Sequence, residues 1–305
     1  MKFDLGEVLT RIWKIGWNHK VLWLWQMIPG ALAIVFLPVS FLINPAFPML
    51  MGKDPDPYLT SPWMPFVFLG VVFVFMVPTV FLGVLAQLTA TWGAAKVERG
   101  AESLGFMDLF HDVKPYYWRV FGLYAIFLGA WMVIWFGFVF VTMAGSIVTM
   151  GLASLCIFPI MLLAIPVMIV GYSALELAQA AVVVEDLGVV DSISRAWHLF
   201  RANWLGVTVV IVLLYFLMYI ISMVVTLPIM FPMMMLMPAL AGTQMSSSVL
   251  VGAVVAGVFL LFFAISILSQ AVLMTFFKIS WVVLYLRIRG GEDTPAVEPS
   301  AMEKI

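Results

Sequence analysis

The chain has 305 residues, of which 64% are hydrophobic and only 10% are charged, with a formal net charge of −1 and a mean hydropathy of +1.13. About a quarter of the residues in a soluble globular domain are charged, so this composition excludes an ordinary soluble domain. A net charge near zero also gives no argument for nucleic acid as a partner. The composition predicts an integral membrane protein.

Six long apolar stretches follow one another along the chain. A helix needs about 20 mostly apolar residues to cross the hydrocarbon core of a bilayer. The stretches fall at residues 21–43 and 63–97, twice between 119 and 176 with a turn near 144–146, at 204–227, and within 249–286. We therefore predict an all-α membrane protein of six transmembrane helices, folded as a single membrane domain over residues 1–290.

Lysine and arginine are concentrated on one side of the predicted spans. These residues are Lys2, Arg11, Lys14, Lys20, Lys96, Arg99, Lys114, Arg119, Arg195, Arg201, Arg287 and Arg289. The other side carries only Lys53, beside two aspartates. Because positive residues accumulate in cytoplasmic loops, we expect a cell-membrane protein with both termini in the cytoplasm. Residues 291–305 are polar and are predicted to be a disordered cytoplasmic tail.

Three cytoplasmic segments resemble one another, and each precedes an odd-numbered span. They begin with Leu-Gly pairs at residues 5–6, 104–105 and 187–188. Their apolar residues recur at helical spacing, which predicts amphipathic helices lying in the membrane interface. We therefore predict three hairpin repeats, at about residues 4–100, 101–186 and 187–290. The offset between the second and third repeats is 83 if the Leu-Gly pairs are aligned and 87 if Glu98 is aligned with Glu185.

The sequence around the third segment resembles a known family. The stretches AVVVEDLG at 181–188 and SISRAWHLFRANW at 192–204 are similar to the signature of uncharacterised multipass proteins related to the membrane domain of glycerophosphodiester phosphodiesterases. The resemblance covers about residues 4–290 and implies an all-helical bundle. The catalytic domain that accompanies this membrane domain has no counterpart here, so the resemblance does not imply phosphodiesterase activity.

Ionisable side chains inside a span are costly and are functional candidates by default. Glu176 lies well inside the fourth span, and Gln179 follows it on the same helical face. Lys278 precedes Arg287 by nine residues, as Glu176 precedes Glu185, so we expect Glu176 and Lys278 to pair. The pair could serve transport, or it could be a structural ion pair.

Two more glutamines and a set of basic side chains complete the candidate residues. Gln87 and Gln270 lie within the second and sixth spans, where polar side chains commonly hold helices together. The basic candidates on the interfacial segments are Lys14, His111, Arg195 and His198. These four could contact an anionic lipid headgroup, or they could simply be polar residues of the interface. A metal site is disfavoured, because no carboxylate or thiol pattern supports it.

No catalytic or cofactor-binding motif is present in the sequence. The methionine-rich segment at residues 230–237 is expected to be an outer interfacial or re-entrant loop. Two functions stay open. The first is a non-enzymatic scaffold, stabiliser or lipid-binding partner of other membrane proteins. The second is a transporter or channel for a lipid or small solute that uses Glu176. An enzyme ranks third, since nothing positive supports one.

Overall fold

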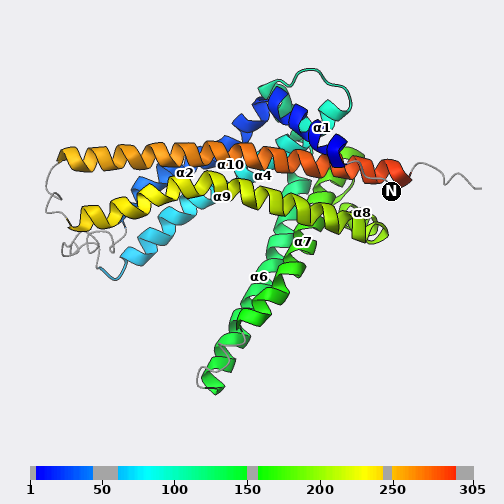
Figure 1. Cartoon of the computed structure of the whole chain (residues 1–305). Coiled ribbons are helices and arrows are strands. Elements are labelled where there is room, and N and C mark those ends of the chain that lie inside the picture. Colours follow the sequence, from blue (N-terminus) through cyan, green and yellow to red (C-terminus); the bar gives the residue numbers. More distant parts are fainter. Residues whose placement is uncertain (1–4, 44–60, 150–156, 243–248, 293–305) are drawn as a thin grey trace, which may run out of the picture. The chain divides into compact units, whose positions relative to one another are not determined.

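The computed structural model describes residues 5–43, 61–149, 157–242 and 249–292. These residues form nine α-helices (Figure 1): α1 (Leu5–Asn18), α2 (Val21–Ile43), α4 (Met64–Glu98), α5 (Phe106–Val113), α6 (Tyr117–Val148), α7 (Ile157–Glu185), α8 (Val189–Ala202), α9 (Trp204–Gly242) and α10 (Val249–Glu292). The described part of the chain contains no strand. The predicted all-α class is therefore confirmed.

Five stretches of the described helices are long and apolar enough to span a membrane. They lie in α4, α6, α7, α9 and α10, and a sixth candidate is the pair α1 and α2, which meet at a bend of 72°. In α6, none of the residues in the most apolar window is buried inside the protein (0%). Such a large exposed apolar surface requires lipid or another protein around it. The chain is thus an all-helical membrane protein with five to six spans.

Three details of the sequence prediction are wrong. The turn expected near residues 144–146 is helical, because α6 continues to Val148. The methionine-rich segment is not a loop, since α9 continues to Gly242. The first two residues of the expected tail belong to α10, which ends at Glu292. The remainder of that tail and Lys53 lie outside the described residues.

The short helices α5 and α8 begin in the same way. Gly105 and Gly188 occupy the N-cap positions in extended conformation. A Cβ on Gly105 would lie 2.1 Å from the carboxylate of Asp108, and one on Gly188 would lie 3.3 Å from that of Asp191. The aspartates therefore fold back over the cap, where a carboxylate is favourable for the helix dipole. Because glycine has no side chain, the aspartate carboxylate can occupy this space.

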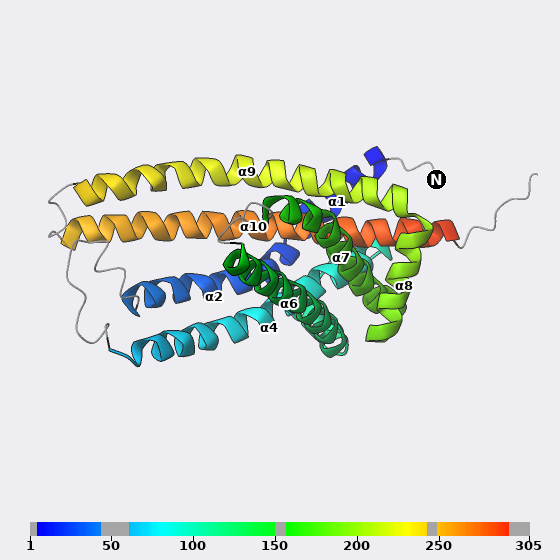
Figure 2. The same ribbon diagram turned by 90° about the horizontal axis from the view of Figure 1, so that it is seen from below.

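The described chain divides into two compact units. The first comprises Met1–Ile15, Thr91–Leu213 and Lys278–Ile305. Within it, α6 and α7 form an antiparallel hairpin whose helices lie side by side (Figures 1 and 2), and α7 also contacts α8. Its core contains alanine, leucine and valine side chains of α7 together with buried residues of α8 and α10. The functional candidates Glu176, Gln179 and Lys278 lie in this core.

The second unit comprises Gly16–Ala90 and Leu214–Phe277. Here the end of α1 and α2 both approach α10 closely, because a Cβ on Gly16 of α1 would lie 2.4 Å from the ring of Phe276 and one on Gly30 of α2 would lie 2.6 Å from Ile267. The Gln26 amide of α2 donates a hydrogen bond to the Ala86 carbonyl oxygen of α4 at 3.1 Å. The Thr275 hydroxyl of α10 also donates to the Leu22 carbonyl oxygen of α2 at 3.5 Å. Small residues and polar contacts thus hold these spans together, as is common in membranes.

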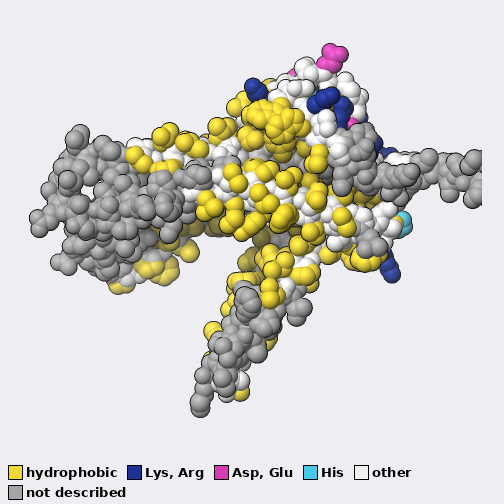
Figure 3. Space-filling model, viewed as in Figure 1, with side chains coloured by type: hydrophobic (Ala, Val, Ile, Leu, Met, Phe, Trp, Pro, Cys, Tyr) yellow, Lys and Arg dark blue, Asp and Glu magenta, His cyan; other side chains and the backbone are white. Residues whose placement is uncertain are grey.

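Side-chain types are distributed along the helices as the membrane assignment requires. Figure 3 shows hydrophobic side chains over the visible described surface of α6, α9 and α10. The visible charged side chains gather on the side of the view where α1 and α8 are labelled. The visible described surface of the long helices α6 and α9 is mainly apolar in this view.

Candidate functional site

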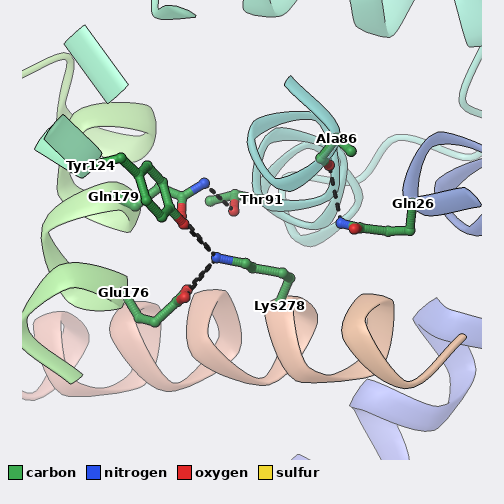
Figure 4. Close-up of polar contacts among 7 residues, drawn as sticks. All are labelled: Gln26, Ala86, Thr91, Tyr124, Glu176, Gln179 and Lys278. Carbon is green, nitrogen blue, oxygen red and sulfur yellow. Dashed lines mark hydrogen bonds and ion pairs between the residues drawn. The ribbon is translucent and has the colours of Figure 1, made fainter. Parts of the chain in front are cut away.

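Lys278 on α10 is the centre of a buried polar network in the first unit (Figure 4). Its Nζ atom lies 2.6 and 2.7 Å from the two carboxylate oxygens of Glu176 on α7. Both residues are almost fully buried, with exposed fractions of 1% for Lys278 and 2% for Glu176. The pairing of Glu176 with Lys278 that the sequence predicts is therefore present.

Three further polar side chains complete this network. Lys278 Nζ also donates to Gln179 Oε1 at 2.9 Å and to the Tyr124 hydroxyl at 3.0 Å. The Tyr124 hydroxyl donates to the same Gln179 oxygen at 2.9 Å. Gln179 Nε2 in turn donates to Thr91 Oγ1 at 3.1 Å. The network around Lys278 of α10 thus includes side chains of α4, α6 and α7.

Helix geometry and the apolar surroundings explain this arrangement. Glu176 and Gln179 are three residues apart and therefore share one face of α7. Lys278 precedes Arg287 by nine residues, which is about 14 Å along α10. A charge at that distance from the last turn is surrounded by apolar side chains, where leaving it unpaired is strongly unfavourable. The ion pair between Lys278 of α10 and Glu176 of α7 avoids this cost.

The hydrogen bonding of the network favours a structural role. A lysine ammonium has three N–H donors. Four oxygen atoms of Glu176, Gln179 and Tyr124 lie within 3.0 Å of Lys278 Nζ. Every donor of the ammonium is therefore occupied by the protein itself. A transported solute would have to displace one of these contacts, whereas a structural network gains rigidity from being fully satisfied.

Glu185, the last residue of α7, connects three more side chains of the first unit. Its carboxylate oxygens lie 3.5 Å from Nε of Arg195 on α8 and 3.5 Å from Nε of Arg289 on α10. The Tyr285 hydroxyl donates to the same carboxylate at 2.6 Å. The structure therefore places Arg195, a lipid candidate in the sequence, beside a carboxylate that balances its charge.

Other ion pairs join the helix ends and the short helices. Arg11 pairs with Glu98 at 2.8 Å, Lys96 pairs with Asp112 at 2.8 Å, and Arg119 pairs with Asp186 at 2.6 Å. All three pairs are partly exposed, and exposed pairs each contribute only about 0–1 kcal/mol to stability. They orient the short helices more than they stabilise the fold.

Asp112 provides a pH-dependent test of one of these pairs. The hydrogen bond from Lys96 holds the pKa of Asp112 below its ordinary value, although partial burial acts in the opposite direction. A lowered folded-state pKa contributes stability above the unfolded value of about 3.9, and this stability is lost as the pH falls through the folded value. We expect Asp112→Asn to lower stability by less than about 1 kcal/mol at pH 7.

Thermal unfolding of the wild type and Asp112→Asn, measured from pH 7 down to pH 3, checks this expectation. The two unfolding temperatures should converge at the acidic end, because protonated Asp112 no longer attracts Lys96. A difference that stays constant over the whole pH range would mean that the ion pair does not contribute.

The basic lipid candidates lie on separate short helices. Lys14 is exposed on α1, His111 on α5 and His198 on α8. Nδ1 of His111 lies 2.9 Å from the Met107 carbonyl oxygen of its own helix. Lys14 therefore keeps a charged group available to a headgroup, whereas the ring of His111 already has a partner on one nitrogen.

Two cations that the sequence analysis placed on the cytoplasmic side, Lys114 and Arg201, were not among its lipid candidates. Both side chains are exposed, and neither forms an ion pair with any residue that the structure describes. Lys114 directly follows α5 and Arg201 lies in the last turn of α8, and in both cases an exposed tryptophan follows within four residues. Their separation of 87 residues, equal to that between Glu98 and Glu185, is the signal that could have identified them.

The remaining candidates take different positions. Gln87 is half-buried on α4 and has an interaction partner, in agreement with a packing role. Gln270 is exposed on α10, beside Gln26 of α2 in a groove. Over the described ranges, no group of three or more histidine, cysteine, aspartate or glutamate side chains could hold a metal ion.

Comparison with protein families gives one match. Residues 105–288 match a family described as a domain of unknown function (DUF7847). The match covers more than half of the chain. The chain belongs to this family. The matched region runs from the N-cap of α5 to the last turns of α10, so the DUF7847 match includes the whole Glu176–Lys278 network except Thr91. No curated protein and no solved structure matches the chain.

An uncharacterised membrane family was expected from the sequence, and DUF7847 membership agrees with that expectation. The family match does not link the chain to glycerophosphodiester phosphodiesterases. Because the description of DUF7847 carries no activity, the functional argument must come from the geometry of the side chains.

Proposed function

We propose that this DUF7847 protein is a non-enzymatic membrane protein that binds anionic lipid at its cytoplasmic surface and acts as a scaffold or stabiliser for other membrane proteins. In this proposal both termini lie in the cytoplasm of a cell-membrane protein, because lysine and arginine are concentrated on that side. The threefold hairpin repeat is part of the same proposal, supported by the shared caps of α5 and α8.

One observation carries the proposal: an exposed cation lies near the C-terminal end of each short helix, and an exposed tryptophan follows it within four residues. Lys14 and Trp17 lie in the last five residues of α1. Lys114 is the C-cap of α5 and Trp118 is in the first turn of α6, while Arg201 is in the last turn of α8 and Trp204 begins α9. The three tryptophans are 41%, 68% and 56% exposed, in that order. Tryptophan favours the depth of the headgroups, and lysine or arginine there attracts anionic lipid.

The buried network supports a scaffold more than a transporter. The ammonium of Lys278 is saturated by oxygen atoms of the protein, and Glu176 is 2% exposed. The alternative, a transporter or channel that uses Glu176, requires this carboxylate to exchange its partner with a solute. A buried network that only holds helices together is expected in a scaffold, which binds its partners through its surface.

Lipid titration of the purified, delipidated protein tests the proposal. The variant Lys14→Gln/Lys114→Gln/Arg201→Gln should bind phosphatidylglycerol more weakly than the wild type. Each cation near the membrane surface contributes about 1 kcal/mol, so three correspond to roughly a hundredfold change in affinity. Phosphatidylcholine binding should not change, because it carries no net charge. Native mass spectrometry of each lipid complex gives both affinities.

Lys96→Gln is a control for the loss of a positive charge. Lys96 is partly exposed, but it is already paired with Asp112 at 2.8 Å, so its removal should leave phosphatidylglycerol binding within a few-fold of the wild type. Equal weakening by Lys96→Gln and by the triple variant would show that net charge alone matters. Unchanged binding by the triple variant would contradict the proposal.

A further inference from the structure

The short helices α1, α5 and α8 each expose apolar side chains beside their buried face. Residues three, four or seven positions apart lie on one side of a helix, so the exposed apolar residues of each short helix lie together. They are Leu9, Trp13 and Trp17 in α1, Phe106, Met107 and Phe110 in α5, and Val190 and Trp197 in α8. We call each of these three groups an apolar stripe.

Each apolar stripe lies on the same flank of the buried face. Successive residues of an α-helix are rotated by about 100° about its axis. A buried residue is followed directly by an exposed apolar residue in the pairs Val8 and Leu9, Ile12 and Trp13, Leu109 and Phe110, and Ala196 and Trp197. Exposed polar residues such as Asp108 of α5 and His198 of α8 lie further round the helix. Each short helix thus has a buried, an apolar and a polar side, in the same rotational order.

The helix α8 runs along the membrane surface at which its neighbours end. The consecutive spans α7 and α9 meet this surface at Glu185 and Trp204. Only residues 186–188 join α8 to α7, and only Asn203 joins it to α9. The 14 residues of α8 are about 21 Å long. If α8 pointed away from the membrane, its two ends would differ in depth by that length, which a linker of one residue cannot span.

Lipid is the occupant that fits the apolar stripes. The buried side of each short helix contacts the protein and the polar side requires water, so the stripe faces the remaining environment. Val189, the neighbour of Val190, lies 3.7 Å from the position of a Cβ on Gly122 of the apolar span α6, so this flank of α8 adjoins a span. Amphipathic helices at a membrane surface bury their apolar side about 5–10 Å into the boundary between headgroups and acyl chains.

The apolar stripes enter only one leaflet of the bilayer. The helix α1 precedes α2, α5 lies between α4 and α6, and α8 lies between α7 and α9. These junctions all belong to the same side of the membrane, and the described residues at the opposite ends of the spans form no short helix. Bulky side chains inserted into one leaflet increase its area. A membrane that is convex on that side already has looser headgroup packing, so it accepts such side chains more easily.

We propose that the apolar stripes make the protein sense membrane curvature, so that it concentrates where the bilayer is convex on the side of the short helices. Its partner is then a curved bilayer with loosely packed headgroups, whatever their charge. The proposal rests on the surface position of the short helices, which the proposed function also uses, but it does not use Lys14, Lys114 or Arg201. A preference for membrane shape is thereby added to the proposed preference for lipid charge.

Membrane tubes pulled from giant vesicles test this inference. The full-length protein is reconstituted in phosphatidylcholine and labelled from outside, at an N-terminal tag, with a dye that does not cross membranes. Because α1 begins at Leu5, the dye marks only molecules whose short helices face outward. The density of these molecules relative to lipid should be higher in the tube than in the attached vesicle, and it should rise as the tube is made narrower.

The triple variant Trp13→Gln/Met107→Gln/Val190→Gln should lose this enrichment, because it makes the most exposed residue of each apolar stripe polar. The three side chains are 60%, 63% and 75% exposed, so their replacement should leave the unfolding temperature unchanged. The matched control is Trp13→Leu/Met107→Leu/Val190→Leu, which changes the same positions but keeps them apolar. This control should retain the enrichment.

Equal densities of the wild type in tube and vesicle would overturn the proposal. Enrichment that the glutamine variant keeps would also overturn it, since the shape of the spans would then be the cause. Pairing of wild-type molecules on the flat vesicle, abolished in the glutamine variant, would assign the apolar stripes to a second copy of the chain instead. The vesicles contain no anionic lipid, so failure here is separate from failure of anionic headgroup binding.

Discussion

Replacing Glu176 with glutamine should lower the free energy of unfolding by about 3–5 kcal/mol, the typical effect of breaking a buried ion pair. The substitution leaves the ammonium of Lys278 buried with neutral acceptors only, since Lys278 is 1% exposed. The carboxylate oxygens that it removes are the closest ones, at 2.6 and 2.7 Å. Thermal unfolding in detergent or bicelles should show the loss directly.

The double variant Glu176→Gln/Lys278→Met identifies the origin of that loss. It removes both buried charges, so it should recover a large part of the stability that the single variant loses. Glu102→Gln, a change at an exposed glutamate without a partner in the described structure, should have no measurable effect. A Glu176→Gln protein with wild-type stability that no longer transports a solute would instead favour the transporter.

Replacing Glu185 with glutamine should lower stability by about 1.5–3 kcal/mol, the range for hydrogen bonds to charged groups. Its carboxylate lies between Arg195 and Arg289 and accepts a hydrogen bond from Tyr285 at 2.6 Å. Because the Glu185 side chain is 16% exposed, water compensates only part of the loss. In the variant, no carboxylate would balance the positive charges of Arg195 and Arg289.

Hydrogen exchange can localise the effect of Glu185→Gln. Faster exchange should appear in α8 and in the last turns of α10, because Arg195 and Arg289 anchor these helices to the end of α7. The same substitution at Glu102 serves again as the control. Exchange that increases equally in all helices would mean that Glu185 acts through global stability and does not anchor α8.

The ion pair between Glu176 and Lys278 could be predicted because few charges occur inside the spans and each must find a partner. The other side chains of the network could not be predicted from the sequence. Thr91 and Tyr124 are ordinary residues of membrane helices, and nothing in the sequence separates the tyrosine that reaches Lys278 from those that do not. Gln179 was identified only through its spacing from Glu176 on one helical face.

The errors in the helix boundaries also have physical causes. The glycine and serine near residues 144–146 suggested a turn, but a helix inside lipid keeps its backbone hydrogen bonds because no water can replace them. The Thr149 N–H still donates to the Gly145 carbonyl oxygen at 2.9 Å. The methionine-rich segment is likewise helical, as part of α9, which continues to Gly242.

The two offsets found in the sequence, 83 and 87, are both reflected in the structure. The N-caps Gly105 and Gly188 are separated by 83 residues, whereas the exposed cations Lys114 and Arg201 are separated by 87. α8 has 14 residues and α5 has only 8, while Lys114 follows the last residue of α5 and Arg201 precedes the last residue of α8, and together these differences increase the offset by four. Aligning Glu98 with Glu185 gave the offset that separates the two cations, but only the structure shows that both cations are exposed.

Native mass spectrometry of the protein, gently extracted from the membrane in which it is expressed, tests the central proposal most directly. We predict that anionic phospholipids remain bound to the wild type in excess over their share of the membrane. They should be lost from Lys14→Gln/Lys114→Gln/Arg201→Gln and retained by Lys96→Gln. Bound lipid with the composition of the bulk membrane, or equal retention by all three proteins, would contradict a lipid-binding surface at the ends of the short helices.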